Sequence, residues 1–196
     1  YNEKASRIVR VQVNYTLMGK ENQVVVAPAP MALALRNEFP EVENVVRFRD
    51  YGGSSIRYED KSFNESAIIF ADSTLFDVFS IPLVEGNPKT ALTAPQTIIL
   101  SESMAKKYFG TVEPTGKMLK LDNAVDYEIT GVFKDIPANS HFHFDFIASI
   151  VSSEECNRPT WVSFNFLTYV LLKENADHAA FEKKLSTLVD KYIAVQ

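Results

Sequence analysis

The sequence lacks paired cysteines and long apolar runs. Among its 196 residues Cys156 is the single cysteine, so no disulfide can form within the chain, and this is neutral as to compartment. No run of about 18 apolar residues is present, so no segment is predicted to span a bilayer as a helix. No signal peptide is recognised. The chain starts at Tyr1 and not at Met, and we expect it to be a piece of a longer protein.

Clustered positive charge is also missing. The 20 Lys and Arg residues are scattered against 25 Asp and Glu, which gives a net charge of -5. Because binding to phosphates requires clustered Lys and Arg, nucleic acid is disfavoured as a partner. Apolar residues are plentiful, at 46% hydrophobic with 12% aromatic. This is enough to bury a core in one large domain or two small subdomains.

Gly116-Lys117 suggests a phosphate-binding loop, but the spacing of the glycines excludes one. Gly110 and Gly116 enclose five residues where the P-loop pattern requires four. Met118 stands where that pattern has a hydroxyl for Mg²⁺. A helix is expected before this segment, whereas a P-loop follows a strand. We therefore predict a turn at this point and no nucleotide or other cofactor.

Two further groupings could carry chemistry. Ser103 and Lys106 match the S-x-x-K motif of penicillin-binding enzymes, but the supporting motifs are absent. His141, His143 and Asp145 fall on one face of an expected strand, a spacing that could grip a metal or contribute to a hydrolase triad. No further His or Cys is near, and no nucleophile turn is present. We predict no catalytic and no metal residues, with a hydrolase kept as an alternative.

Trp161 lies in an aromatic stretch with Phe164 and Phe166. Such a stretch could form a platform on which a carbohydrate or peptide stacks. More often, aromatic residues before a buried strand belong to the core or to a subdomain interface. Trp161 is therefore a candidate ligand or interface residue.

The periodicity of apolar residues predicts an α+β fold with an insertion. Helices are expected between Pro30 and Pro40, over 102–109 with Ser101 and Gly110 as caps, and after Asp177. One helical turn within 71–82, capped by Asp72 or Ser73, should pack inward, and 83–88 should form a turn. Strands are expected at 7–15, 45–49, 55–58, 62–71, 98–100, 118–121, 127–133, 141–150 and 164–172.

Seven short motifs carry a resemblance to a known family. In order they are FADS (70–73), FDVF (76–79), PLVEG (82–86), ILSESMAKKYFG (99–110), PxGK (114–117), YxITGVFKDIP (127–137) and NSHFxFD (139–145). Each is modest alone, and their order and spacing together are specific. The chain resembles the extracytoplasmic domain of MacB/FtsX-type ABC transporter permeases, in the form common in Bacteroidetes-like bacteria. The resemblance covers nearly the whole chain.

This resemblance implies a domain on the periplasmic side of the inner membrane, between two transmembrane helices of a permease. It implies a porter-like α/β subdomain at 1–70 and 138–196 and an inserted, β-rich, sabre-like subdomain at 71–137. ATP is expected to be hydrolysed by a separate cytoplasmic ATPase. Further expected partners are a sister permease domain or subunit and a periplasmic adaptor. No catalytic residues are implied, since the domain relays motion mechanically.

Motion between the two subdomains would require hinges, which we expect at Ala71 and Asp72 and at Pro137 and Asn139. An alternative from another class is a periplasmic binding module that captures a ligand in the cleft between the subdomains, close to Trp161.

Overall fold

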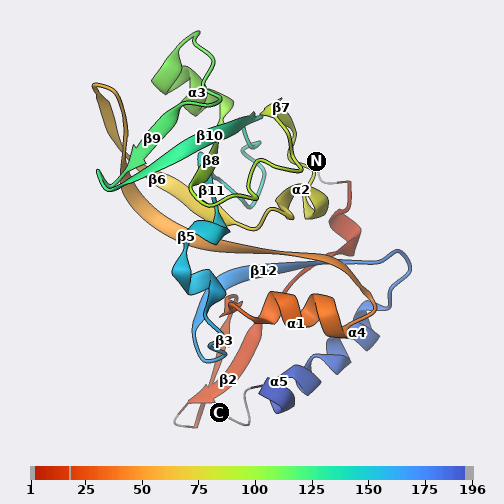
Figure 1. The fold of residues 1–196 in the computed structure, drawn as a ribbon. Coiled ribbons are helices and arrows are strands. Elements are labelled where there is room, and N and C mark those ends of the chain that lie inside the picture. The colour runs from red at the N-terminus through yellow and green to blue at the C-terminus, as the bar shows by residue number, and fades with distance from the viewer. Residues whose placement is uncertain (1–2, 18, 193–196) are drawn as a thin grey trace.

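The computed structural model describes residues 3–17 and 19–192 (Figure 1). The helices are α1 (Met31–Glu38), α2 (Leu75–Val78), α3 (Glu102–Phe109), α4 (His178–Lys184) and α5 (Ser186–Tyr192), with short 3-10 helices η1 (Ala5–Arg7), η2 (Ile150–Ser152) and η3 (Glu154–Asn157). The strands are β1 (Ile8–Arg10), β2 (Val13–Leu17), β3 (Lys20–Val24), β4 (Ala27–Pro28), β5 (Val42–Tyr58), β6 (Lys61–Ala71), β7 (Leu83–Gly86), β8 (Thr97–Ser101), β9 (Met118–Leu121), β10 (Val125–Phe133), β11 (Phe146–Ser149) and β12 (Phe164–Leu172). The predicted α+β class is confirmed.

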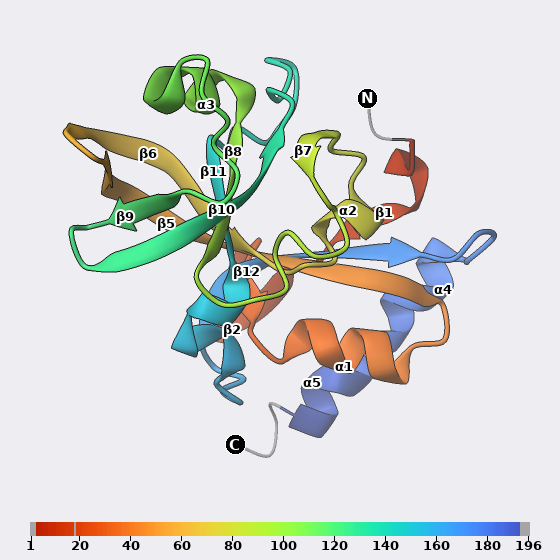
Figure 2. The same cartoon turned by 45° about the horizontal axis from the view of Figure 1, so that its top comes forward.

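One mixed sheet of ten strands dominates the fold. Eight of them lie in the order β1-β12-β5-β6-β11-β8-β10-β7, and β4 and β9 join the sheet at its sides, β4 by pairing with β12. The pairs β6–β11 and β8–β10 are parallel, and the other pairs along this order are antiparallel. β9 pairs with both β10 and β5, so β5, β6, β11, β8, β10 and β9 form a closed circuit. In Figure 2 the green strands β9 and β10 lie against the outer halves of β5 and β6. This half of the protein is therefore barrel-like.

Three apolar clusters hold the elements together. The first is associated with the strand circuit and α3 and includes Ile56, Ile98, Tyr108, Leu119, Ile129 and Phe146. The second gathers around α2 and includes Phe48, Leu75, Val78, Ile99, Phe133 and Ile147. The third joins β5 and β12 to α1, α4 and α5, which lie below these strands in Figure 1, and includes Leu35, Phe39, Val170, Phe181 and Leu188.

The capped helix α3 forms as its sequence predicts. The Ser101 hydroxyl accepts a hydrogen bond from the backbone N–H of Met104 at 3.3 Å. Gly110 ends the helix with φ +65°, and its N–H donates to the Lys106 carbonyl. Asp177 likewise caps α4, accepting from the N–H groups of Ala179 and Ala180. The final helical segment is divided into α4 and α5, where one helix was predicted.

The predicted turn at 83–88 is wrong over its first four residues, because Leu83–Gly86 is strand β7, paired with β10. Gly86 lies opposite Gly131 in this pair. A Cβ on Gly131 would lie 2.7 Å from the Glu85 carbonyl oxygen, which only glycine avoids. The glycine in this stretch thus permits close strand pairing.

The predicted strand at 141–150 is shorter than expected, since β11 begins only at Phe146. Phe142 and Phe144 pack in the cluster around α2, whereas Phe146 lies in the cluster of the strand circuit. The three rings therefore do not share one face. Two more strand predictions need correction: 45–49 and 55–58 are parts of the single strand β5, and 7–15 is divided into η1, β1 and the start of β2.

The sheet continues across the expected subdomain boundary. β11, from the expected porter-like part, pairs with β6 on one side and with β8, from the expected insertion, on the other. β5 pairs with β9 of the expected insertion. The circuit is therefore built from both segments, and the division into 1–70 with 138–196 and 71–137 stays a prediction.

Candidate functional site

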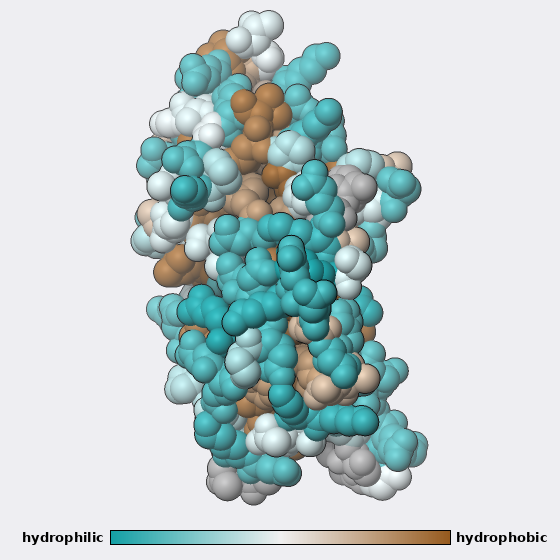
Figure 3. Space-filling model, turned by 90° about the vertical axis from the view of Figure 1, so that its right-hand side faces the viewer, coloured by the Kyte–Doolittle hydropathy of each residue, from teal (hydrophilic) through white to brown (hydrophobic). Residues whose placement is uncertain are grey.

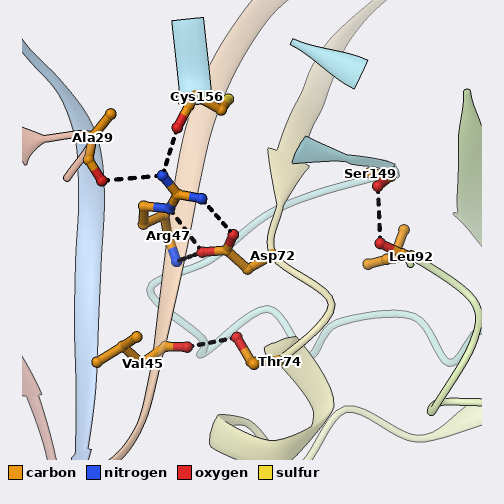
Figure 4. Close-up of polar contacts among 8 residues, drawn as sticks. All are labelled: Ala29, Val45, Arg47, Asp72, Thr74, Leu92, Ser149 and Cys156. Carbon is orange, nitrogen blue, oxygen red and sulfur yellow. Dashed lines mark hydrogen bonds and ion pairs between the residues drawn. The ribbon is translucent and has the colours of Figure 1, made fainter. Parts of the chain in front are cut away.

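A buried arginine on β5 binds three segments that lie far apart in the sequence (Figure 4). Arg47 lies on β5 and is 7% exposed. Its Nε and Nη2 atoms donate to Oδ2 and Oδ1 of Asp72 at 3.0 and 2.8 Å. Its Nη1 donates to the carbonyl oxygens of Ala29 and Cys156 at 3.0 and 2.9 Å. One side chain thus joins β5, the end of β6, the start of α1 and η3.

Arg47 and its three partners are called the Arg47 node below. The charges and hydrogen bonds in this node favour the ion pair between Arg47 and Asp72. Burial acts to lower the pKa of Arg47, but the hydrogen bonds and charge of Asp72 outweigh it and the pKa is raised. The backbone N–H of Arg47 also donates to Oδ2 of Asp72 at 2.7 Å. Asp72 is therefore a partner of Arg47 and not the helix cap that was predicted, since Thr74 stands at the N-cap of α2 with no side-chain cap bond.

An open cleft of about 660 Å³ lies where the expected segments meet. It is lined by Ala5, Ile8, Arg10, Phe79, Ser80, Asn139, Ser140, His141, Phe142 and Tyr169. These residues come from η1, β1, the segment after α2, the loop before β11, and β12. Figure 3 views the side of the molecule that is on the right in Figure 1, where a belt of hydrophilic side chains crosses the middle and apolar side chains gather above it.

The floor of the cleft is aromatic. Phe79, Phe142 and Tyr169 are 5%, 7% and 4% exposed, and their ring centroids are 5.1 to 5.4 Å apart in edge-to-face pairs. Phe48 packs against all three from β5. Such contacts fix the rings in place.

Three polar side chains converge above this floor. Arg10 is paired with Tyr169 across β1 and β12, and the Tyr169 hydroxyl lies 3.4 Å from Nε2 of His141. Burial raises the pKa of Tyr169, although hydrogen bonding and charge from Arg10 oppose the rise. Burial and then the charge of Arg10 lower the pKa of His141. Tyr169 and His141 are therefore both neutral near pH 7.

Trp161 does not line this cleft. It is 6% exposed in the cluster beneath α1, and its ring stacks on Tyr192 at 4.3 Å with an interplanar angle of 4°. One face of its indole ring is therefore covered by the chain itself. A ligand stacking on that face would require α5 to move, and a ligand role for Trp161 stays a prediction.

The candidate catalytic pairs do not meet. The Ser103 hydroxyl donates to Oδ2 of Asp135 at 2.5 Å, while Lys106 is exposed. His141 faces Tyr169, and Asp145 interacts instead with Ser101 at the start of α3. Within residues 3–17 and 19–192, no hydrogen bond joins either predicted pair, and no group of three His, Cys, Asp or Glu side chains could hold a metal. The arrangement supplies no nucleophile with its base.

The four expected hinge residues have different environments. Ala71 is fully buried in β6 and is paired with Phe48 and Ser149. Asp72 is bound to Arg47, as described above. Pro137 and Asn139 are exposed in the loop that leads to the cleft. Ala71 and Asp72 are therefore held by more contacts than Pro137 and Asn139, and a hinge role for these four residues stays a prediction.

Sequence reasoning missed Arg10, Arg47 and Tyr169. A signal existed for Arg47, because it interrupts the apolar run Val45-Val46-Arg47-Phe48. A charged side chain inside a buried strand requires a partner. Nothing local marks Arg10 or Tyr169, which are brought together by strand pairing between distant parts of the chain.

Comparison with known families gives one match that covers almost the whole chain. The model of the MacB-like periplasmic core domain matches residues 2–188. No curated protein matched the sequence. No helix in the described part of the chain combines the length and apolar character needed to cross a bilayer.

Solved structures share the fold. A domain of a protein described as a permease from Porphyromonas gingivalis superposes with a TM-score of 0.87 at 26% identity, covering 98% of this chain and 84% of that one. The periplasmic region of MacB from Actinobacillus actinomycetemcomitans gives 0.70 at 18% identity, covering 95% and 84%. The extracellular domain of the ABC-type transporter YknZ from Gram-positive bacteria gives 0.65 at 15% identity, covering 94% of each chain.

Proposed function

The chain belongs to the family of MacB-like periplasmic core domains, and on that premise we propose that it relays ATP-driven movement of a permease to transport or to a periplasmic partner. It does so without catalysis of its own. The ATP would be hydrolysed by a separate cytoplasmic ATPase, and the domain would work against a sister domain or subunit, or a periplasmic adaptor. The domain would lie on the periplasmic side of the inner membrane, tethered by flanking transmembrane helices.

The observation that carries this proposal is the closed circuit of strands fastened to the helical half by Arg47. A relay must resist deformation along its length, because force applied at one end would otherwise be lost in bending. The circuit leaves few free edges, and the packed clusters on the faces of the sheet oppose its flexing. The contacts of Ser103, Lys106, His141 and Asp145 support a role without catalysis.

We further propose that movement within the domain is a small twist of the sheet and not an opening at two loose loops. The first crossing, at Ala71 and Asp72, is held by strand pairing and by Arg47. The loop at Pro137 and Asn139 would take up the change. Asn139 of that loop lines the cleft, so the width of the cleft would report the twist.

A removable crosslink across the cleft tests the proposal. Ala5 and Ser80 line the same cleft from the two expected segments, and both would be changed to cysteine. Cys156 is 4% exposed and would first be changed to alanine, so that only the introduced thiols react. In the whole transporter, reconstituted in lipid, the two introduced cysteines are crosslinked to each other with a bismaleimide that contains a reducible disulfide.

Crosslinking should slow steady-state ATP hydrolysis several-fold and leave binding of a fluorescent ATP analogue unchanged. Reduction of the linker should restore the rate. Each single-cysteine variant, treated in the same way, is the matched control for thiol modification. Hydrolysis that continues at the uncrosslinked rate would contradict the proposed relay.

A further inference from the structure

The cleft holds a set of groups that a purely mechanical relay does not need. Buried rings form its floor, and a cation, a phenol and an imidazole lie along its wall. We propose that this cleft binds a small carboxylate with an aromatic or other apolar body, the body resting on Phe79 and Phe142 and the carboxylate meeting Arg10 and Tyr169. This site is independent of the proposed relay and can be tested on the chain alone.

The shape of the cleft suits such a ligand. Its volume of about 660 Å³ lies within the range of roughly 300–1,000 Å³ typical of small-molecule sites. The rings of Phe79 and Phe142 are buried and held by Phe48, so the floor is formed before a ligand arrives. A preformed apolar surface costs little ordering on binding. Ile8 extends the apolar lining on the side of β1.

The charge of the cleft selects an anion. Arg10 lies on the wall with a planar guanidinium that can grip a carboxylate with two hydrogen bonds. Among the described residues that line the cleft there is no aspartate or glutamate, and Arg10 forms no ion pair within the described chain. A cationic ligand would therefore face Arg10 without compensation.

Neutral donors complete the site. Tyr169 is paired with Arg10 across β1 and β12, and the two side chains are hydrogen-bonded to each other. The Tyr169 hydroxyl can donate to the second carboxylate oxygen, and Ser140 and Asn139 offer further polar groups at the rim. The loop that carries Asn139 to Phe142 would be fixed against β12 when the cleft is filled.

Titration of the chain with 2-naphthylacetate, followed by amide chemical shifts in 1H–15N spectra, tests the inference. We expect saturable shifts centred on Ile8, Phe79, His141 and Tyr169, with a dissociation constant on the order of 1 mM for a ligand of this size. The neutral isostere 2-naphthylacetamide should bind about tenfold more weakly or worse, because it lacks the charge that Arg10 recognises.

Variants distinguish recognition of the carboxylate from nonspecific binding of the naphthyl ring to apolar surface. Arg10→Gln should weaken naphthylacetate about tenfold, and Tyr169→Phe should weaken it by less, since it retains the ring and removes only the hydroxyl. Arg36→Gln, at an exposed position on α1, is the matched control and should bind as the parent chain does. The same spectra report whether each variant is folded.

Three outcomes would overturn the proposal. These are no saturable shift up to about 10 mM probe, shifts centred outside the cleft, or equal affinity for the acid and the amide. The comparison of acid with amide uses the parent chain, so the proposal stays falsifiable even if a variant fails to fold.

Discussion

Replacing Arg47 with methionine removes the charge that fastens β5 to Asp72 and leaves an unbranched side chain of similar length. Four hydrogen bonds from the guanidinium are lost, two to the Asp72 carboxylate and one each to the carbonyls of Ala29 and Cys156. The Asp72 side chain is 19% exposed and would stay in place without its cation. The variant therefore leaves a charge and two carbonyls uncompensated.

The expected loss of unfolding free energy follows from these contacts. Removing one partner of a buried pair costs about 3–5 kcal/mol. The backbone N–H of Arg47 still donates to Asp72 at 2.7 Å, so part of the compensation survives and we expect the lower end, about 3 kcal/mol. For a domain of this size that corresponds to a fall in melting temperature of roughly 6–12 °C. It is a large share of the ~5–15 kcal/mol that stabilises a typical protein.

Urea unfolding, followed by the fluorescence of the single tryptophan and by far-ultraviolet circular dichroism, measures this loss. The matched control is Arg49→Met. Arg49 pairs with Glu155 at 3.0 Å, but these side chains are 34% and 28% exposed, so the cost should be at most about 1 kcal/mol. In a double-mutant cycle, Arg47→Met with Asp72→Leu should recover about 1–3 kcal/mol of the summed losses.

The reasoning would be refuted if Arg47→Met cost less than about 1 kcal/mol, or no more than Arg49→Met. Either result would mean that the node contributes no more than a surface ion pair.

Three further predictions concern other parts of the fold. Tyr108→Phe removes a buried hydroxyl that donates to Oε1 of Glu65 at 2.7 Å and should cost about 1–2 kcal/mol in urea unfolding; an unchanged midpoint would contradict this. Burial and a neighbouring arginine lower the pKa of His141 in the folded chain. The imidazole therefore binds a proton more readily in the unfolded chain, and the stability that His141 contributes above about pH 6.5 should be lost as pH falls. His141→Gln should therefore flatten the decline of melting temperature between about pH 7 and pH 5, and an identical slope would sink the idea. Gly131→Ala would bring a methyl group against the Glu85 carbonyl, should cost about 1–3 kcal/mol, and should speed amide exchange in β7; unaltered exchange would count against that close approach.

Features fixed by local hydrogen bonds could be predicted from the sequence. Ser101 and Gly110 bracket α3 because capping involves groups only a few residues apart. Asp177 caps α4 in the same way, whereas Pro30 and Pro40 flank α1 without a side-chain cap bond, because proline restricts the backbone at a helix end. The hairpin of β5 and β6 follows from its turn, where Glu59 adopts a positive φ.

Features set by distant parts of the chain were not accessible to local reasoning. Alternation predicted a strand over 141–150 with His141, His143 and Asp145 on one face, but the strand starts only at Phe146, where pairing with β6 and β8 begins. Asp72 is a good helix cap by type, yet Arg47 competes for its carboxylate and prevails, because a buried guanidinium is costly to leave unpaired.

The candidate site was the least predictable feature. Trp161 was predicted as a candidate ligand or interface residue, but its side chain packs in the apolar cluster that contains α1 and stacks on Tyr192. The cleft is assembled from segments that lie far apart in sequence, and neither Arg10 nor Tyr169 belongs to a recognisable motif. Only the pairing of β1 with β12 brings these two residues together.

The most direct test of the relay is a distance measurement between spin labels in the whole transporter. Val112, after α3, and Leu33, on α1, are 56% and 47% exposed and can each carry a label on the chain and on its sister domain. Pulsed electron–electron double resonance would compare the nucleotide-free state with an ATP-trapped state. We predict that the distance distributions between the two domains shift by several ångströms when ATP is bound. Identical distributions in both states, at both positions, would contradict the proposal that this domain moves with the ATP cycle.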